Sequence, residues 1–555
     1  MQVMPRTGRD ALLDVLRTEG VRHLFGNPGS TELPLMDALA GADDLHYVLC
    51  LQEATAVGMA DGYAQATRRP AFLNLHTSAG LGNAIGNLTN AQTMGTPLVV
   101  TAGQQHYGHI ETDPLLAGDL VGLAAPVSKW THEVRSLREM GTILRRAFHD
   151  AVGPPGGPVF VSLPMSTLDE EGDAPVPPPS RIVRRTTASD LDELVDLVTG
   201  PAVGKLAIVA GRDVGTSSAV GALAELAEAL GAPVFAAPLD GVGVLQPTHP
   251  LYAGMLPPAA AAIRATLAPY ERVFAIGARP FTAYPYTDGS PLPDGTELIQ
   301  LCPDARQLGR TFAVRLGLVG DPRATLDALV PLARDRADTA AAKDALEAGR
   351  VRRAAEIQRL EELARERYGS TPLDPMAAAH AVVRAMPPGM AVVDEAITTG
   401  VYIRGFHHWT EPGRYFFCEG GGLGWGMPAA LGVSLAHDGT VPVLAAVGDG
   451  SAMYSPQALW TAAHERLPIV FAVFVNREYL ILKNYLRSRK GESVERDRYV
   501  AMQITDPDVD YVALAASMGV AATRVDSAGD IGDVVNAALA TGAPHLVEIP
   551  ISVPE

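Results

Sequence analysis

The chain has 555 residues, 47% of them hydrophobic, so it can bury several large cores, and at about 150 residues per domain it holds three or four domains. Its net charge of −18, from 44 Lys and Arg against 62 Asp and Glu, argues against nucleic acid or an anionic membrane as the main partner. Three scattered cysteines (Cys50, Cys302 and Cys418) disfavour a disulfide framework or a zinc site and fit a cytoplasmic protein, and the apolar stretch 467–475 is too short to span a membrane.

The first 180 residues read as repeated strand–helix units. A helix is predicted over residues 8–19, and a second begins near Glu32 after the loop 26–30. A third helix starts at Glu53, and the stretch 77–80 is predicted to be a loop that opens a fourth. Apolar runs predict strands at 23–25, 47–51, 71–75, 97–102 and 158–163. This alternation predicts a doubly wound parallel sheet.

Two further α/β domains follow. Residues 171–180 are rich in proline and predict an extended linker. The class is therefore α/β, with three doubly wound domains at about 1–180, 185–335 and 370–555. Residues 334–367 are rich in Ala, Glu and Arg and predict a charged helical linker between the second and third domains.

The last domain contains a strand–helix–strand unit with polar residues where each strand ends. An apolar strand at 443–447 stops at the run Gly-Asp-Gly-Ser (448–451), and a second strand at 469–475 ends at Asn476. Asp449 and Asn476 are 476 − 449 = 27 residues apart, yet both lie at the carboxyl edge of a parallel sheet. Their oxygen atoms, beside a glycine-rich helix start, suit a hard divalent cation that holds a diphosphate.

Two other features suggest chemistry. Glu53 is a carboxylate among apolar neighbours, where a buried helix start or a catalytic acid is expected. The glycine run 420–422 allows a backbone to approach a ligand closely.

Together these motifs resemble the thiamine diphosphate-dependent 2-oxo acid decarboxylases, and within that family the benzoylformate-decarboxylating branch. The similar segments are GNPGSTELPL, LQEATAVGMADGYAQATRRPAFLNLHTSAGLGNA, TPLVVTAGQQ, GGLGWGMPAALGV and GDGSAMYSPQALWTAA. The resemblance implies that the three domains are pyrimidine-binding, central and diphosphate-binding, in that order. It also implies a homodimer or homotetramer with active sites at the subunit interface.

The resemblance also assigns roles to residues. The side chains of Asp449 and Asn476 and the backbone carbonyl of Glu478 would bind Mg²⁺ or Ca²⁺. Glu53 would activate the cofactor through its pyrimidine ring, and His76 and Ser30 would act on the reacting substrate. The other implied cofactor contacts are Thr398, Gly421, Leu423, Gly450, Ser451, Tyr454 and Tyr479, and the implied substrate pocket is formed by Pro28, Leu115, Leu116, Tyr284, Ile397, Ile481 and Tyr485.

The chain departs from the family pattern in two segments. The segment GARPFTAYPYTDGS lacks the family's second catalytic histidine and offers Tyr284 or Tyr286 instead. A phenol, with an ordinary pKa of about 10, is a weaker acid–base group at neutral pH. After Asn476, Arg477 stands where a glycine is usual, and it would be strained if that position needs a positive φ.

The expected function is non-oxidative decarboxylation of an aromatic or branched 2-oxo acid to an aldehyde and CO₂. The alternative is a carboligase or lyase, acyloin-forming or 2-hydroxyacyl-cleaving, that uses the same cofactor. A cofactor-binding but catalytically idle subunit and an FAD-dependent, acetolactate-synthase-like enzyme are the remaining hypotheses.

Overall fold

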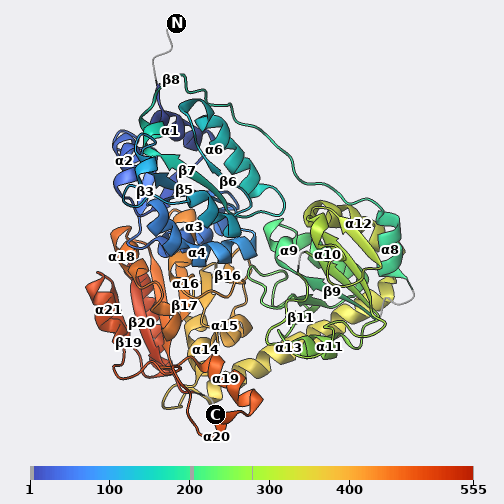
Figure 1. Cartoon of the computed structure of the whole chain (residues 1–555). Coiled ribbons are helices and arrows are strands. Elements are labelled where there is room, and N and C mark those ends of the chain that lie inside the picture. Colours follow the sequence, from blue (N-terminus) through green and yellow to red (C-terminus); the bar gives the residue numbers. More distant parts are fainter. Residues whose placement is uncertain (1–5, 201–204, 278, 554–555) are drawn as a thin grey trace. The chain divides into compact units, whose positions relative to one another are not determined.

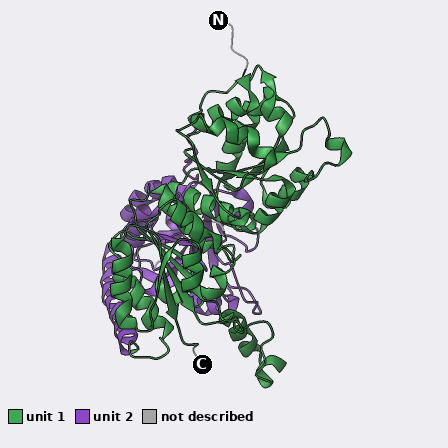
Figure 2. Cartoon of the chain, turned by 90° about the vertical axis from the view of Figure 1, so that its left-hand side faces the viewer, with its two compact units in different colours: residues 1–181, 367–403, 418–555 green, residues 182–366, 404–417 purple. Residues whose placement is uncertain are grey.

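The computed structural model describes residues 6–200, 205–277 and 279–553, and the chain divides into two compact units (Figure 2). One unit comprises residues 1–181, 367–403 and 418–555, and the other comprises 182–366 and 404–417. The predicted α/β class with three parallel sheets is confirmed (Figure 1). The predicted domain limits stay predictions. Among the described residues, no helix combines the length and apolar character that a membrane crossing requires.

The first sheet has six parallel strands in the order β3-β2-β4-β5-β7-β6. Every residue of β4 is buried, as expected for a strand covered by helices on both faces. The strands are β2 (His23–Gly26), β3 (His46–Leu49), β4 (Ala71–Leu75), β5 (Leu98–Gln104), β6 (Thr131–Glu133) and β7 (Val159–Pro164). The main helices around them are α1 (Gly8–Thr18), α2 (Leu33–Leu39), α3 (Glu53–Thr67), α4 (Thr77–Met94) and α6 (Leu137–Val152).

The stretch 77–80, predicted as a loop, is the first turn of α4, so that prediction was wrong. The helix starts immediately after His76, which occupies the N-cap position with an extended backbone. Gly80, in this first turn, lies close to the side chain of Glu53. A Cβ atom at Gly80 would lie 3.1 Å from Oε1 of Glu53.

The C-terminal sheet positions the predicted diphosphate motif. Within the first compact unit its parallel strands follow the order β15-β17-β18-β20-β19. These are β15 (Ala391–Glu395), β17 (Val443–Gly448), β18 (Ile469–Val475), β19 (Ala521–Arg524) and β20 (His545–Pro550). Because β17 and β18 are adjacent and parallel, Asp449 and Asn476 follow neighbouring strand ends, as the sequence predicted.

The second compact unit contains a six-stranded parallel sheet of its own, in the order β11-β10-β9-β12-β13-β14. Its strands are β9 (Leu206–Ala210), β10 (Val234–Ala236), β11 (Tyr252–Met255), β12 (Arg272–Ile276), β13 (Glu297–Cys302) and β14 (Leu316–Val319). The predicted charged linker is helical: α12 (Pro322–Arg336) is followed by α13 (Thr339–Glu366). Helix α13 carries i,i+4 ion pairs such as Arg365 with Glu361.

Glycines allow α3 to contact α16 (Gly426–Ala436) closely within the first unit. A Cβ atom on Gly432 would lie 1.9 Å from the carbonyl oxygen of Met59, and one on Gly62 would lie 2.2 Å from that of Ala429. Beside this contact the indole of Trp425 donates a 2.9 Å hydrogen bond to the buried carboxylate of Asp61. The helix that begins at Glu53 is thereby fixed against the helix that follows the glycine run.

Candidate active site

Asp449 begins the short helix α17 (Asp449–Ala452) and is almost fully buried. Its carboxylate accepts hydrogen bonds from backbone N–H groups, that of Gly450 at 2.8 Å and that of Arg477 at 2.5 Å. Burial nevertheless raises the pKa of this carboxyl to about 6, because these N–H groups only partly replace the lost water. A divalent cation beside it would restore the charged form.

The backbone turns sharply after β18. Arg477 has a φ of 60°, so the strain that the sequence predicted for an arginine at this position is confirmed. The turn brings the N–H of Arg477 to Asp449, and Oδ1 of Asn476 accepts from the N–H of Glu478 at 3.0 Å. The predicted metal ligands are thus brought together by backbone hydrogen bonds.

The side chain of Glu478 is occupied by an ion pair. Its Oε2 meets the ammonium group of Lys483, and both side chains are largely buried. Among the described residues Oε1 of Glu478 has no hydrogen-bond partner. The carboxylate is therefore engaged with Lys483, which leaves the backbone carbonyl for the role predicted at this position.

No group of three or more His, Cys, Asp and Glu side chains within the described residues could hold a metal ion. The donors near Asp449 still fit Mg²⁺, because one carboxylate, one amide oxygen and one backbone carbonyl leave positions for phosphate oxygens and water. The oxygen-only donor set also fits Ca²⁺.

Further residues surround this cluster. The ring of Tyr479 covers Gly450, where an added Cβ would lie 2.7 Å from the ring, and burial raises the pKa of Tyr479. The hydroxyl of Ser451 donates to the carbonyl of Glu395 at 3.4 Å. Thr398, in the loop after β15, is half-buried, and Tyr454 is exposed and contacts Gly424.

Two residues of this cluster were missed from the sequence. The hydroxyl of Tyr511 donates a 2.9 Å hydrogen bond to the carbonyl of Asp449. The carboxylate of Glu395 accepts from the N–H groups of Trp425 and Gly426, both at 3.0 Å, and burial raises its pKa to about 7. The acidic pair at the end of an apolar strand, Asp394-Glu395, was a usable signal for the second of these residues.

The glycine run 420–422 is hydrogen-bonded to a residue of the N-terminal part of the same compact unit. Buried Asn90 of α4 donates to the carbonyl of Gly422 and accepts from its N–H, both at 3.0 Å. Gly421 has a φ of 73° and open space where a side chain would be. Leu423 follows, half-buried. The backbone of the glycine run is therefore open to a ligand, and the two hydrogen bonds of Asn90 fix its position.

Glu53 is the first residue of α3 and is buried. One of its oxygens accepts from the amide of Asn27 at 3.3 Å, and the other accepts from that of Asn83 at 3.0 Å. Two neutral donors therefore fix the carboxylate without an opposing charge. Asn83 was missed, although it lies in the same family-like segment as Glu53, because it is 30 residues away in sequence and no spacing rule pairs the two.

His76 is paired with a carboxylate that the sequence prediction also missed. Its Nδ1 lies 2.8 Å from Oε2 of Glu32, and the hydroxyl of Thr31 lies 3.1 Å from the same nitrogen. Glu32 is 1% exposed and also accepts from the N–H groups of Gly29 and Gly103, at 2.9 and 2.8 Å. The tautomer with its proton on Nδ1 would donate to Glu32 and leave Nε2 outside this pair.

The residue after His76 is strained. Thr77 has a φ of 47°, which is rare for a β-branched residue, and it is fully buried. Its hydroxyl has no partner among the described residues. Such strain is found mostly where a functional site requires it.

The predicted substrate residues differ widely in exposure, and the described contacts do not join them into one cluster. Leu115 is 84% exposed, and Leu116 has a φ of 67° with its carbonyl accepting from Ser78. Tyr284 is 60% exposed and belongs to the second compact unit. Ser30 and Ile481 are exposed, whereas Pro28, Ile397 and Tyr485 are half-buried. The roles given to these residues stay predictions.

Comparison with known proteins identifies all three regions. Residues 6–123 match the N-terminal thiamine pyrophosphate-binding domain of thiamine pyrophosphate enzymes, residues 202–329 match their central domain, and residues 398–549 match their C-terminal thiamine pyrophosphate-binding domain. A benzoylformate decarboxylase of Pseudomonas aeruginosa is 34% identical over 98% of this chain and 99% of its own. A glyoxylate carboligase of Escherichia coli O157:H7 is 27% identical over 98% of this chain and 92% of its own.

Among solved structures, benzoylformate decarboxylase from Polynucleobacter necessarius superposes with a TM-score of 0.88 at 28% identity, over 99% of both chains.

Proposed function

The chain belongs to the thiamine pyrophosphate enzymes, and from that premise we propose that it decarboxylates an aromatic or branched 2-oxo acid, without oxidation, to an aldehyde and CO₂. The observation that carries this proposal is the pair between buried Glu32 and half-buried His76, because it supplies an oriented proton donor in addition to Glu53. The full-length similarity to a benzoylformate decarboxylase supports the substrate class.

In this proposal the C-terminal cluster anchors the cofactor. Asp449, Asn476 and the carbonyl of Glu478 would hold Mg²⁺, or Ca²⁺, for the diphosphate, and Ser451 would offer its N–H group at the start of α17, whereas the N–H group of Gly450 donates to Asp449. Bound thiamine diphosphate supplies the nucleophilic carbon and the electron sink for loss of CO₂.

The N-terminal cluster manages protons. Glu53, held by Asn27 and Asn83, holds a proton at the pyrimidine ring of the cofactor. Nε2 of His76 delivers a proton to the reacting carbon while Glu32 stabilises the charge on the imidazole. Ser30 positions the substrate carboxylate. The proposal includes a homodimer or homotetramer, with Glu53 of one subunit serving the cofactor held by Asp449 of another.

The test is an aldehyde assay with purified protein, thiamine diphosphate and Mg²⁺. Benzoylformate is offered first, followed by a panel of branched and aromatic 2-oxo acids. Glu53→Gln is the matched control, because it keeps the shape of the side chain and removes its proton chemistry. If no acid in the panel yields an aldehyde above this control, the proposal is wrong.

A carboligase or lyase is the second candidate. It is favoured by the absence of histidine from residues 279–290, where Tyr284 and Tyr286 stand, and by the similarity to a glyoxylate carboligase. Weaker proton donation would let a second aldehyde react in place of the proton. Adding an acceptor aldehyde and analysing the products separates the two candidates: a 2-hydroxy ketone supports ligation, and the simple aldehyde alone excludes it.

A further inference from the structure

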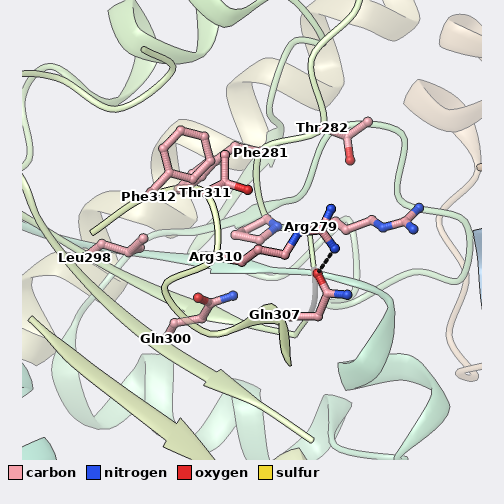
Figure 3. A pocket seen from close by; sticks show the side chains of 10 residues that line it. Arg279, Phe281, Thr282, Leu298, Gln300, Gln307, Arg310, Thr311 and Phe312 are labelled. Atoms are coloured by element: carbon pink, nitrogen blue, oxygen red, sulfur yellow. Dashed lines mark hydrogen bonds between the residues drawn. The ribbon is translucent and has the colours of Figure 1, made fainter. Parts of the chain in front are cut away.

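A small cavity in the second compact unit is lined by residues that have no role in the proposed reaction. It has a volume of about 240 Å³ and lies between β13 and the loops that follow β12 and β13 (Figure 3). Its volume is below the range of about 300–1,000 Å³ for typical ligand sites, so a whole dinucleotide does not fit. A small molecule is the appropriate occupant.

Two exposed arginines line this cavity, and neither forms an ion pair with a described residue. Among the described residues Arg279 has no ion pair, and Arg310 only donates a long 3.4 Å hydrogen bond to Gln307. Other arginines of this sheet do form ion pairs: Arg272 pairs with Glu297 at 2.8 Å, and Arg306 pairs with Asp304 at 3.0 Å. No acidic residue lines the cavity, although the chain has 62 acidic against 44 basic residues.

A buried amide adds a neutral donor. Gln300 of β13 is only 4% exposed, and its Oε1 accepts from the N–H of Gly309 at 3.4 Å. Its Nε2 donates to none of the described residues, and the side chain lines the cavity. Water can reach this nitrogen, because it is not one of the buried unpartnered side-chain atoms of the described residues, and it can donate to a molecule in the cavity.

Part of the lining is aromatic. The rings of Phe281 and Phe312 meet edge to face, with centroids 5.5 Å apart and planes at 85° (Figure 3). Phe281 is buried, and Leu298 extends the apolar wall. This surface would contact a flat apolar group, whereas a bare inorganic anion would leave it unused.

We propose that this cavity binds a small organic acid, with its carboxylate on Arg279, Arg310 and Gln300 and a planar apolar group against Phe281 and Phe312. Planar guanidinium groups match a carboxylate geometrically, and charge-assisted hydrogen bonds are the strongest available to them. The site lies in the second compact unit, whereas Glu53 and Asp449 belong to the first.

The test is calorimetric titration of benzoate into the protein saturated with thiamine diphosphate and Mg²⁺. Arg279→Gln and Arg310→Gln should each weaken one benzoate site at least tenfold. The matched control is Arg315→Gln, an exposed arginine whose nearest carboxylate, that of Glu297, is 3.7 Å away and which does not line the cavity. Equal stoichiometry and affinity in all three variants would overturn the proposal.

Two further measurements define the ligand. Phe312→Ala should weaken benzoate binding and leave the binding of inorganic phosphate unchanged. If phosphate binds in an arginine-dependent manner and benzoate does not, the assignment of an organic acid is wrong. Binding is measured without turnover, so a failed aldehyde assay leaves this result intact, and absent benzoate binding leaves the proposed reaction intact.

Discussion

The clusters around Asp449 and Glu32 share a buried carboxylate that accepts backbone hydrogen bonds, but the other partners of the two carboxylates differ. Each centres on a buried carboxylate that accepts two backbone N–H bonds, and each has a strained non-glycine residue immediately after a predicted site residue: Arg477 after Asn476, and Thr77 after His76. The difference lies in what else the carboxylate meets. Glu32 also meets an imidazole, whereas Asp449 accepts only backbone N–H groups from the described residues.

This difference separates two functions of a buried carboxylate. A carboxylate that faces a histidine orients a proton carrier, and its lone pairs are already used. One that faces only backbone keeps lone pairs for a cation, and without the cation burial disfavours its charge. Four measurements test this comparison, starting with the largest expected effect.

Asp449→Asn should abolish productive binding of the metal and cofactor. Removing the only charged ligand of the proposed site should raise the Kd for thiamine diphosphate with Mg²⁺ by at least about 100-fold, which corresponds to about 2.7 kcal/mol. Quenching of tryptophan fluorescence reports the Kd. Asp526→Asn, at an exposed surface ion pair, is the control. Unchanged affinity in Asp449→Asn would show that Asp449 does not bind the cation.

Glu32→Gln should lower kcat by about 10²-fold, at the lower end of the usual effect of acid–base groups. The amide keeps the shape of the side chain but cannot stabilise a charged His76. Cofactor affinity should not change, because the Glu32 carboxylate contacts only Gly29, Thr31, His76 and Gly103 among the described residues. A matching loss of cofactor affinity would show that Glu32 supports the fold instead of orienting the histidine.

The stability of the metal-free protein should depend on pH through Asp449. Its folded pKa is raised from 3.8 to about 6, so the folded state prefers the protonated form, and stability is lost as the pH rises through 6. When the pH is lowered from 7 to 5, the free energy of unfolding of the wild type should rise by about 1.4 kcal/mol relative to that of Asp449→Asn. One pKa unit corresponds to about this energy. Denaturant unfolding at both pH values measures it. No pH dependence in the difference would contradict the raised pKa.

Arg477→Gly should have the smallest effect and should stabilise the protein by about 0.5–1 kcal/mol. Glycine adopts a positive φ without strain, and the ion pair of Arg477 with Asp508 is half exposed and worth little. The thermal midpoint measures the change. Arg487→Gly, in the last turn of helix α19 (Leu480–Arg489), is the opposite control and should destabilise the protein. A drop in stability for Arg477→Gly would show that the arginine side chain is needed there.

Sequence reasoning located features whose signal is local. The strand before Asp449, the strand before Asn476 and the helix starting at Glu53 each follow from a short run of residues, and the structure contains all three. The strain at Arg477 was also foreseeable from one position.

The missed residues depend on contacts between distant segments. Asn90 meets Gly422 across 332 residues, and Tyr511 meets Asp449 across 62. No periodicity or spacing records such pairs. Gly80, in the stretch wrongly predicted to be a loop, closely approaches Glu53, which is another contact between separate segments.

Helix α4 acts as a spacer of fixed length. His76 precedes its first turn and Asn90, which clamps Gly422, lies 90 − 76 = 14 residues further, about 21 Å at 1.5 Å per residue. This helix connects His76 to the glycine run, so a shift of one is transmitted to the other. Engineering of substrate range should therefore leave α4 unchanged and vary Ile481 and Tyr485, where a change does not alter that spacing.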